Sequence, residues 1–324
     1  MIHLDNKKWP SSPLKQKNLD AEQLKQFLTI RADYEKSAFV TEGHFEVRAL
    51  GAKEFTRPIP PGTETKRNLK VWITYRGTRY HGFQRQSNAL AVQEVLEEKV
   101  SKVLNEPVTI YGCSRTDTGV HANRYCFNVY TSSSIRNIGF VRGVNGELPA
   151  DISVLSCEDA PPEFHARYDC VGKEYLYRIH ASESKNPFET DLSYHYRRPL
   201  DLDRVREAAK YFVGTHDFAS FCADCTNVST TIRTIYSLEI ENSGTSVIML
   251  VKGDGFLYNM IRIIAGTLID VNEKRFEPSD MPAILAARDR LAAGRTAMAH
   301  GLYLNRVFYD KEELYRRRLP DADV

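Results

Sequence analysis

Residues 112–122, GCSRTDTGVHA, bring a carboxylate, a guanidinium and an imidazole together in one loop between two predicted strands. The glycines of this run permit backbone angles closed to other residues, so Asp117 is expected on a tight turn. If the loop is locally extended, Arg115 points to the same side as Asp117 and its charge keeps the carboxylate ionised. Two interpretations stay open on local chemistry. Asp117 is a catalytic carboxylate, or it closes a hairpin as an Asx turn, with His121 as a hydrogen-bonded turn or core residue.

The hydrophobic pattern around this loop predicts a β-α-β-β-α-β order. Apolar and polar residues alternate as in a strand over 69–75. Apolar residues then recur at helical spacing over 92–104, until Asn105 and Pro107 end the helix. The other elements of this half are strands at 108–112, 125–131 and 152–157 and a weaker helix at 138–144.

The second half repeats the order. We expect strands at 174–180, 231–240, 246–251 and 303–309, and helices at 201–214, 257–271 and 282–291. Asp201 is the predicted cap of the first of these helices. Each half is therefore ferredoxin-like in order. The predicted fold is α+β, with two RRM-like halves whose antiparallel sheets, lying side by side, would leave a cleft between them, and with the Asp117 loop at one edge of the first sheet.

The chain divides into four predicted parts. Residues 1–67 form an N-terminal extension that ends in a Pro-rich linker at 58–62 and contains one short helix candidate at 21–33. The first α+β domain spans 68–165 and carries the Asp117 loop, and the second spans 166–310. Residues 311–324 form a basic tail.

Composition indicates a soluble globular protein, because 42% of the 324 residues are hydrophobic and 27% are charged. We find no apolar run of membrane-spanning length and no secretory signal, so the expected address is cytoplasmic. The six cysteines are then expected to stay reduced. Cys222 and Cys225 have the spacing of a metal knuckle near His216, but no second pair completes a zinc site, so no metal is expected.

The Asp117 motif resembles the catalytic motif of the TruA-type tRNA pseudouridine synthases. Further motifs of that family follow in order along residues 69–309, namely YRGTRYHGFQRQ at 75–86, NGELP at 145–149, FHAR at 164–167, KEYLY at 173–177, GFLYNMIRIIAG at 255–266 and GLYL at 301–304. An ordered set spread over the chain is far more specific than one motif. The resemblance implies the pseudouridine synthase fold, in which two α+β halves lie around a basic cleft. It also implies the isomerisation of uridine to pseudouridine in tRNA, at positions 38 to 40 of the anticodon arm. That reaction needs no metal, nucleotide or flavin.

The resemblance also implies roles for four residues. Asp117 is the carboxylate beside the sugar and base, as a nucleophile or as an electrostatic and proton-transfer partner. Tyr175 matches the active-site tyrosine that contacts the base, although Tyr177 shares its strand face and is an alternative. Arg262 matches the arginine that pairs with the aspartate, and a charge in so apolar a helix requires a partner. Arg115 resembles the arginine that helps to extrude the base.

Any RNA footprint is expected to be local, because the formal net charge is only +2. The candidate RNA contacts are Arg76, Arg79, Gln84, Arg85, His121 and Arg167. Ser114 and Arg76 depart from the family pattern, in which glycine and aspartate are common, and either change is expected to alter loop shape or RNA grip. Family members are commonly homodimers that hold one tRNA across both subunits.

Two other functions compete with this interpretation. A non-catalytic RNA-binding protein or tRNA chaperone on paired RRM-like sheets has no need of Asp117, Tyr175 and Arg262 together, since a carboxylate repels phosphate. A hydrolase that uses Asp117 with His121 lacks a recognisable second carboxylate or a serine partner.

Overall fold

The computed structural model describes residues 59–226 and 228–315. The helix expected over 21–33, most of the N-terminal extension and the end of the basic tail lie outside these residues. Within the described ranges, no helix is long and apolar enough to cross a membrane.

The first half contains four strands and two helices in the predicted order. Strand β1 pairs with both β3 and β4, and β2 pairs with β3, all antiparallel. Helix α2 ends where the sequence indicates, because Asn105 takes the left-handed conformation at φ +56°. The elements are β1 (Arg67–Tyr75), α2 (Val92–Leu104), β2 (Ile110–Gly112), β3 (His121–Thr131), α3 (Asn137–Glu147) and β4 (Ile152–Ala160).

The second half repeats this arrangement with two added strands. Strand β5 lies between β10 and β9, and β8 follows β9. Asp201 caps α4 as predicted, since its side chain accepts a hydrogen bond of 3.1 Å from the Arg204 amide. The elements are β5 (Gly172–Ala181), β6 (Tyr194–Tyr196), α4 (Leu202–Lys210), β7 (Gly214–Asp217), β8 (Ile232–Ser243), β9 (Ser246–Gly253), α5 (Met260–Asn272), α6 (Met281–Ala287), β10 (Leu302–Phe308) and α7 (Lys311–Tyr315).

Short 3₁₀ turns connect several of these elements. They lie at Gly77–Arg79, Pro187–Glu189, Ala219–Phe221, Pro278–Asp280, Arg290–Ala292 and Ala299–Gly301.

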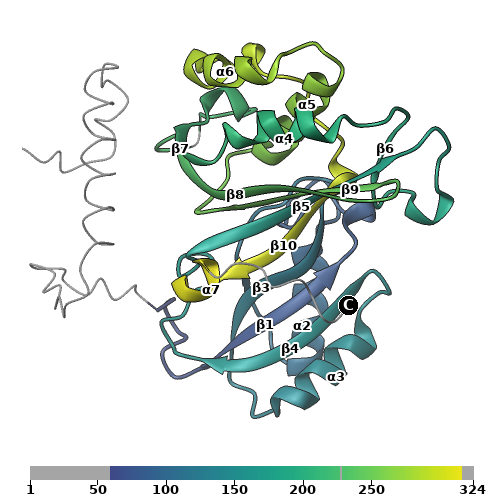
Figure 1. The fold of residues 1–324 in the computed structure, drawn as a ribbon. Coiled ribbons are helices and arrows are strands. Elements are labelled where there is room, and N and C mark those ends of the chain that lie inside the picture. Colours follow the sequence, from purple (N-terminus) through teal and green to yellow (C-terminus); the bar gives the residue numbers. More distant parts are fainter. Residues whose placement is uncertain (1–58, 227, 316–324) are drawn as a thin grey trace, which may run out of the picture. The chain divides into compact units, whose positions relative to one another are not determined.

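The two predicted sheets join into one. The strand order is β4-β1-β3-β10-β5-β9-β8-β7, and Figure 1 shows β10 in yellow between β5 and β3. The joint between β3 and β10 is parallel, with His121 opposite Tyr303 and Ala122 opposite Leu304. Because parallel strands begin at the same edge of a sheet, the loop before β3 and the segment before β10 come together. That edge is where Asp117 lies.

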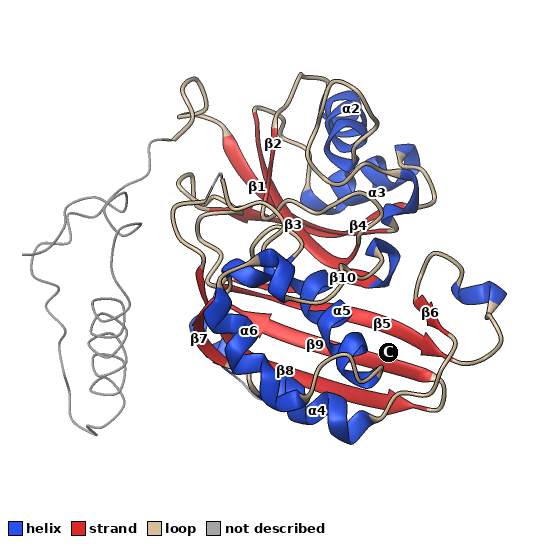
Figure 2. Cartoon of the chain, turned by 90° about the horizontal axis from the view of Figure 1, so that it is seen from above, coloured by secondary structure: helices blue, strands red, loops and turns tan. Residues whose placement is uncertain are grey.

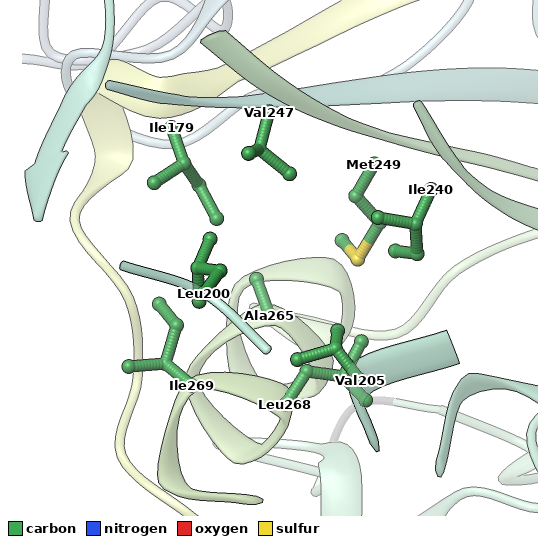
Figure 3. A pocket seen from close by; sticks show the side chains of 9 residues that line it. All are labelled: Ile179, Leu200, Val205, Ile240, Val247, Met249, Ala265, Leu268 and Ile269. Carbon is green, nitrogen blue, oxygen red and sulfur yellow. The ribbon is translucent and has the colours of Figure 1, made fainter. Parts of the chain in front are cut away.

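Helices cover the second half on one face. Figure 2 shows α4, α5 and α6 over strands β5, β9 and β8, while α2 and α3 pack against the first half. The layer between helices and strands is apolar, as the close-up in Figure 3 shows, and its side chains are Ile179, Leu200, Val205, Ile240, Val247, Met249, Ala265, Leu268 and Ile269. Every residue of α5 except Arg262 and Asn272 is buried. Burial of this surface stabilises the half, at about 25 cal/mol per Å² of apolar area.

Several element boundaries differ from the sequence-based prediction. Strand β3 begins at His121 instead of residue 125, and α5 begins at Met260 because Asn259 takes a left-handed conformation at φ +60°. Helix α4 ends at Lys210, so Gly214 starts strand β7. Strands β6 and β7 were not predicted, since each has only three or four residues and no clear alternation.

Candidate active site

Backbone hydrogen bonds to the segment that follows β1 fix the Asp117 loop. The Phe83 amide donates to the Thr116 carbonyl at 3.3 Å, and the Gly119 amide donates to the Tyr80 carbonyl at 3.2 Å. Gly119 has φ +79°, which side chains rarely adopt, and this turn lets the Val120 amide donate back to the Asp117 carbonyl at 3.1 Å. Asp117 therefore sits on a fixed tight turn.

Arg262 is the cation that pairs with Asp117. Its Nη1 lies 3.4 Å from Asp117 Oδ2, and both side chains are largely buried, 18% and 24% exposed. The guanidinium also donates to Asn259 Oδ1 at 2.6 Å and, through Nε, to the Ala297 carbonyl at 2.8 Å. Three acceptors on three segments thus satisfy a charge that the rest of α5 would not tolerate. Two groups 145 residues apart in sequence meet here.

The segment that carries Ala297 is fixed against α5 by a second ion-pair cluster. Asp270, which is buried, accepts from the Arg295 amide at 3.0 Å and from Arg295 Nε at 2.8 Å. Gly266 makes the close approach possible, because a Cβ there would lie 1.8 Å from the Arg295 carbonyl oxygen. These contacts set the place of Ala297 and, through it, of Arg262.

Burial raises the pKa of the Asp117 carboxyl above its usual value, and the charge of Arg262 and its hydrogen bond act in the opposite direction. The sequence-based expectation that Arg115 supplies the partner charge is wrong. The Arg115 side chain is exposed, and Arg262 is the charge that acts on the Asp117 carboxyl. Asp117 is a largely buried carboxylate whose charged form Arg262 favours.

Tyr175 approaches the Asp117 loop from β5. Across the joint, Tyr175 of β5 is level with the start of β3, because Leu304 of β10 pairs with Tyr175 on one side and with Ala122 of β3 on the other. Its hydroxyl is 3.4 Å from Ser114 Oγ, and its ring meets Phe256 edge-on with centroids 5.2 Å apart. Burial raises the pKa of the Tyr175 phenol, so it stays protonated at neutral pH.

Tyr177 is the alternative to Tyr175 on the same strand face. It is fully buried, and its hydroxyl donates to the Met298 carbonyl at 2.8 Å. This side chain supports the segment before β10 and is less available to a ligand than Tyr175.

Arg115 lines a hollow beside the Asp117 loop. Gln84 and Arg167, both predicted RNA contacts, line the same hollow, which has a volume of about 310 Å³. The structure thus brings two of the predicted RNA contacts, Gln84 and Arg167, together with Arg115, from the loop after β1, the turn before β5 and the loop after β2.

His121 does not lie on the surface that this role requires. It is buried, its Nδ1 accepts from the Gly77 amide at 2.9 Å, and its Nε2 is 3.2 Å from the His300 carbonyl. Burial lowers the pKa of His121 to about 4, so the ring is neutral and donates through Nε2. The prediction that His121 contacts RNA is therefore wrong. The residue ties the two halves together, as the core interpretation of the motif indicated.

The remaining predicted contacts are exposed arginines with intramolecular partners. Arg85 pairs with Glu97 at 3.0 Å and Arg79 with Asp151 at 3.4 Å. Arg76 donates to Thr78 Oγ1 at 3.2 Å. Each keeps enough exposed surface to reach a phosphate.

Sequence reasoning missed the groups that position Arg262. Asn259 stands three residues before the arginine in the motif GFLYNMIRIIAG, so its place was visible but its left-handed geometry was not. Asp270 and Arg295 carry no local signal of their pairing, because they are 25 residues apart and belong to different elements. The described residues contain no group of three or more His, Cys, Asp or Glu side chains that could hold a metal ion.

The geometry defines an α+β protein with two ferredoxin-like halves, in which a half-buried carboxylate–guanidinium pair faces the joint between them near a protonated phenol. The family model described as tRNA pseudouridine synthase matches residues 72–169 and 208–310. The chain belongs to this family and is an isomerase.

Relatives match along almost their whole length. A tRNA pseudouridine synthase A 2 of Clostridium tetani is 43% identical over 246 residues, which cover 75% of this chain and 99% of the relative. A tRNA pseudouridine synthase A of Bacillus pumilus is 44% identical over 244 residues, again 75% of this chain and 99% of the relative. Among solved structures, a chain of a Cbf5-Nop10-Gar1 complex aligns with a TM-score of 0.33 and 14% identity over 73% of this chain and 48% of its own.

Proposed function

We propose that this enzyme converts uridine to pseudouridine in the anticodon stem-loop of tRNA, at positions 38 to 40, with Asp117 as the nucleophile. The observation that carries the proposal is the desolvated Asp117–Arg262 pair on a fixed turn at the joint of the two halves. The substrate and its positions follow from the resemblance to the TruA-type enzymes and from the names of the relatives.

The proposed step uses no redox chemistry. A carboxylate oxygen of Asp117 bonds to C1′ of the ribose while the N1–C1′ bond breaks, and the uracil leaves with the bonding electrons. The freed base turns, C5 bonds to C1′ and the carboxylate departs. The proton on C5 goes to solvent and N1 takes up a proton, so atoms and charge balance. Arg262 holds Asp117 ionised and oriented before the attack.

The base must leave its helical stack to reach Asp117, at a cost of a few kcal/mol. We propose that Arg115 assists this extrusion and that Tyr175 contacts the extruded base. Tyr175 supports the assignment by its place, with a hydroxyl 3.4 Å from Ser114 in the Asp117 loop. The resemblance also supports a cytoplasmic homodimer that grips one tRNA across both subunits.

Substitution of the carboxylate tests the proposal. We expect Asp117→Asn to abolish turnover while tRNA affinity stays within a few fold, because the amide keeps the shape but loses the nucleophile. The assay is tritium release from tRNA that contains C5-labelled uridine. Asp203→Asn, at a fully exposed aspartate on α4, is the control and should retain full activity.

Residual turnover of the Asp117→Asn enzyme above a few per cent would exclude Asp117 as the nucleophile. Release of label from uridines outside the anticodon arm, with positions 38 to 40 unchanged, would contradict the proposed target.

A further inference from the structure

One wall of the hollow beside the Asp117 loop is aromatic and takes no part in the proposed reaction at Asp117. Tyr168 lines it and is 58% exposed. The His165 ring lies against Tyr168 with centroids 4.4 Å apart, and Tyr111 meets His165 edge-on at 5.4 Å. The wall is thus a row of three rings in contact, which ends in the exposed ring of Tyr168.

The turn that carries Tyr168 is held in place by polar contacts. The Ala166 amide donates to the buried Asn128 side chain at 2.9 Å, and the Ala166 carbonyl accepts from the Tyr309 hydroxyl at 2.7 Å. The His165 amide donates to Asp169 Oδ2 at 2.7 Å. A ligand that stacks on Tyr168 therefore meets a surface that is already ordered, which lowers the entropic cost of binding.

Two exposed guanidinium groups lie in the same hollow as this wall. Arg115 belongs to the Asp117 loop, and Arg167 directly precedes Tyr168 in sequence. The guanidinium carbon of Arg167 is 5.8 Å from the centre of the Tyr168 ring. Proteins bind single-stranded nucleic acid with aromatic rings that stack on bases and with cationic side chains that contact phosphates. This hollow offers both kinds of group. The volume of about 310 Å³ is at the small end of ligand sites.

Ser114 connects this hollow to the candidate active site. It lines the hollow, and its Oγ is 3.4 Å from the Tyr175 hydroxyl. A uridine at Asp117 and Tyr175 would therefore have its neighbour in the strand at the hollow.

We propose that the hollow between Arg115 and Tyr168 binds the nucleotide next to the target uridine in the same RNA strand. Its base stacks on the Tyr168 ring, and its phosphate contacts Arg115 and Arg167. The inference rests on the proposed function, because it takes Asp117 as the place of the target. It gives Tyr168 a specificity-determining role, since the hollow requires a neighbour whose base can turn out of the helix.

A double-mutant cycle between protein and RNA tests the proposal. The probe is an anticodon stem-loop that the wild-type enzyme modifies, prepared intact and with an abasic site at either neighbour of the target. We expect Tyr168→Ala to weaken binding of the intact RNA by roughly tenfold to a hundredfold, as loss of one stacked base does. The abasic site at the stacked neighbour should weaken wild-type binding by a similar factor. The two changes together should weaken binding little more than either change alone.

Two variants control for the fold and for general aromatic loss. Tyr168→Phe keeps the ring and should bind nearly as the wild type does. Tyr211→Ala removes a 37% exposed tyrosine at the end of α4 and should leave binding unchanged. Thermal unfolding of each variant checks that the fold is retained.

If the losses of affinity caused by Tyr168→Ala and by an abasic site multiply, whichever neighbour is abasic, then Tyr168 stacks on neither base. That result would overturn the hollow as the binding site of the neighbour. The same holds if Tyr168→Phe binds as poorly as Tyr168→Ala. These outcomes leave the wild-type reaction intact, whereas wild-type enzyme that modifies no anticodon stem-loop contradicts the proposed function itself. The binding measurement is separate from turnover, so the role of Asp117 does not affect its interpretation.

Discussion

At the scale of single residues, Arg262 favours the charged form of Asp117. Burial raises the pKa of Asp117, and Arg262 opposes that rise. A nucleophilic carboxylate must be ionised, so the rate is expected to fall as the pH drops through this pKa. Loss of the guanidinium leaves the burial effect unopposed and raises the pKa further.

We therefore expect Arg262→Gln to move the acid limb of the kcat/KM profile to higher pH, by about one unit or more. Arg262→Lys keeps a charge and should move it less. Arg206→Gln, at a partly exposed arginine on α4, is the matched control and should leave the limb in place. The measurement is tritium release from pH 4.5 to 8. An unchanged limb in Arg262→Gln would show that Arg262 does not set the ionisation of Asp117.

The same residues show what sequence could predict at this scale. That Arg262 has a partner could be inferred, because a guanidinium in an otherwise apolar helix needs one, and the family resemblance pointed to Asp117. Local spacing also offered the neighbour Arg115, but its side chain is exposed and the charge beside Asp117 is that of Arg262, 145 residues away in sequence. Tyr175 and Tyr177 share one strand face, so periodicity alone did not separate them, whereas the Met298 contact does.

At the scale of elements, the joint between β3 and β10 depends on neutral His121. Its two ring nitrogens bridge the Gly77 amide of the first half and the His300 carbonyl before β10. Protonation would place a second N–H against the Gly77 N–H in a buried site, which is unfavourable.

The pKa of His121, about 4 in the folded protein against 6.5 ordinarily, gives a stability that depends on pH. A lowered pKa means that the unfolded state binds more protons between these values, so the contribution is full above pH 6.5 and is lost as pH falls toward 4. We expect His121 to account for a loss of about 2 kcal/mol in unfolding free energy between pH 7 and pH 5. Urea unfolding at both pH values measures it.

His121→Gln is the control for this effect, because an amide can replace one hydrogen bond but does not titrate in this range. The variant should be less stable than the wild type at pH 7 and should lose less stability on acidification. An equal pH dependence in both proteins would mean that other groups, such as His300, carry the effect.

The order of elements was largely predictable, and their long-range pairing was not. The β-α-β-β-α-β order of each half follows from local periodicity and from caps such as Asn105 and Asp201. The parallel register of His121 against Tyr303 joins residues that are 182 positions apart, and only two residue pairs define it. No local pattern encodes so short a contact, although it is the one that turns two sheets into one and assembles the site.

At the scale of the whole molecule, charge is distributed in a way that the net value hides. A formal net charge of +2 over 324 residues gives little general attraction for RNA. The exposed arginines at positions 76, 79, 115 and 167 lie in or near the loops around the candidate site. Binding must then rely on a small set of phosphate contacts that these loops supply.

The salt dependence of tRNA binding follows from this distribution. Each phosphate contact releases counterions, so the logarithm of affinity falls linearly with the logarithm of salt, with a slope of about 0.7 to 0.9 per contact. With about four contacts, affinity for the anticodon stem-loop should fall roughly a hundredfold between 50 and 200 mM salt. Arg167→Ala should reduce the slope by about one. Tyr168→Ala should lower affinity at every salt concentration without changing the slope, because stacking releases no counterions. Affinity that barely responds to salt would contradict the electrostatic account, and a shape-specific or apolar interface would have to replace it.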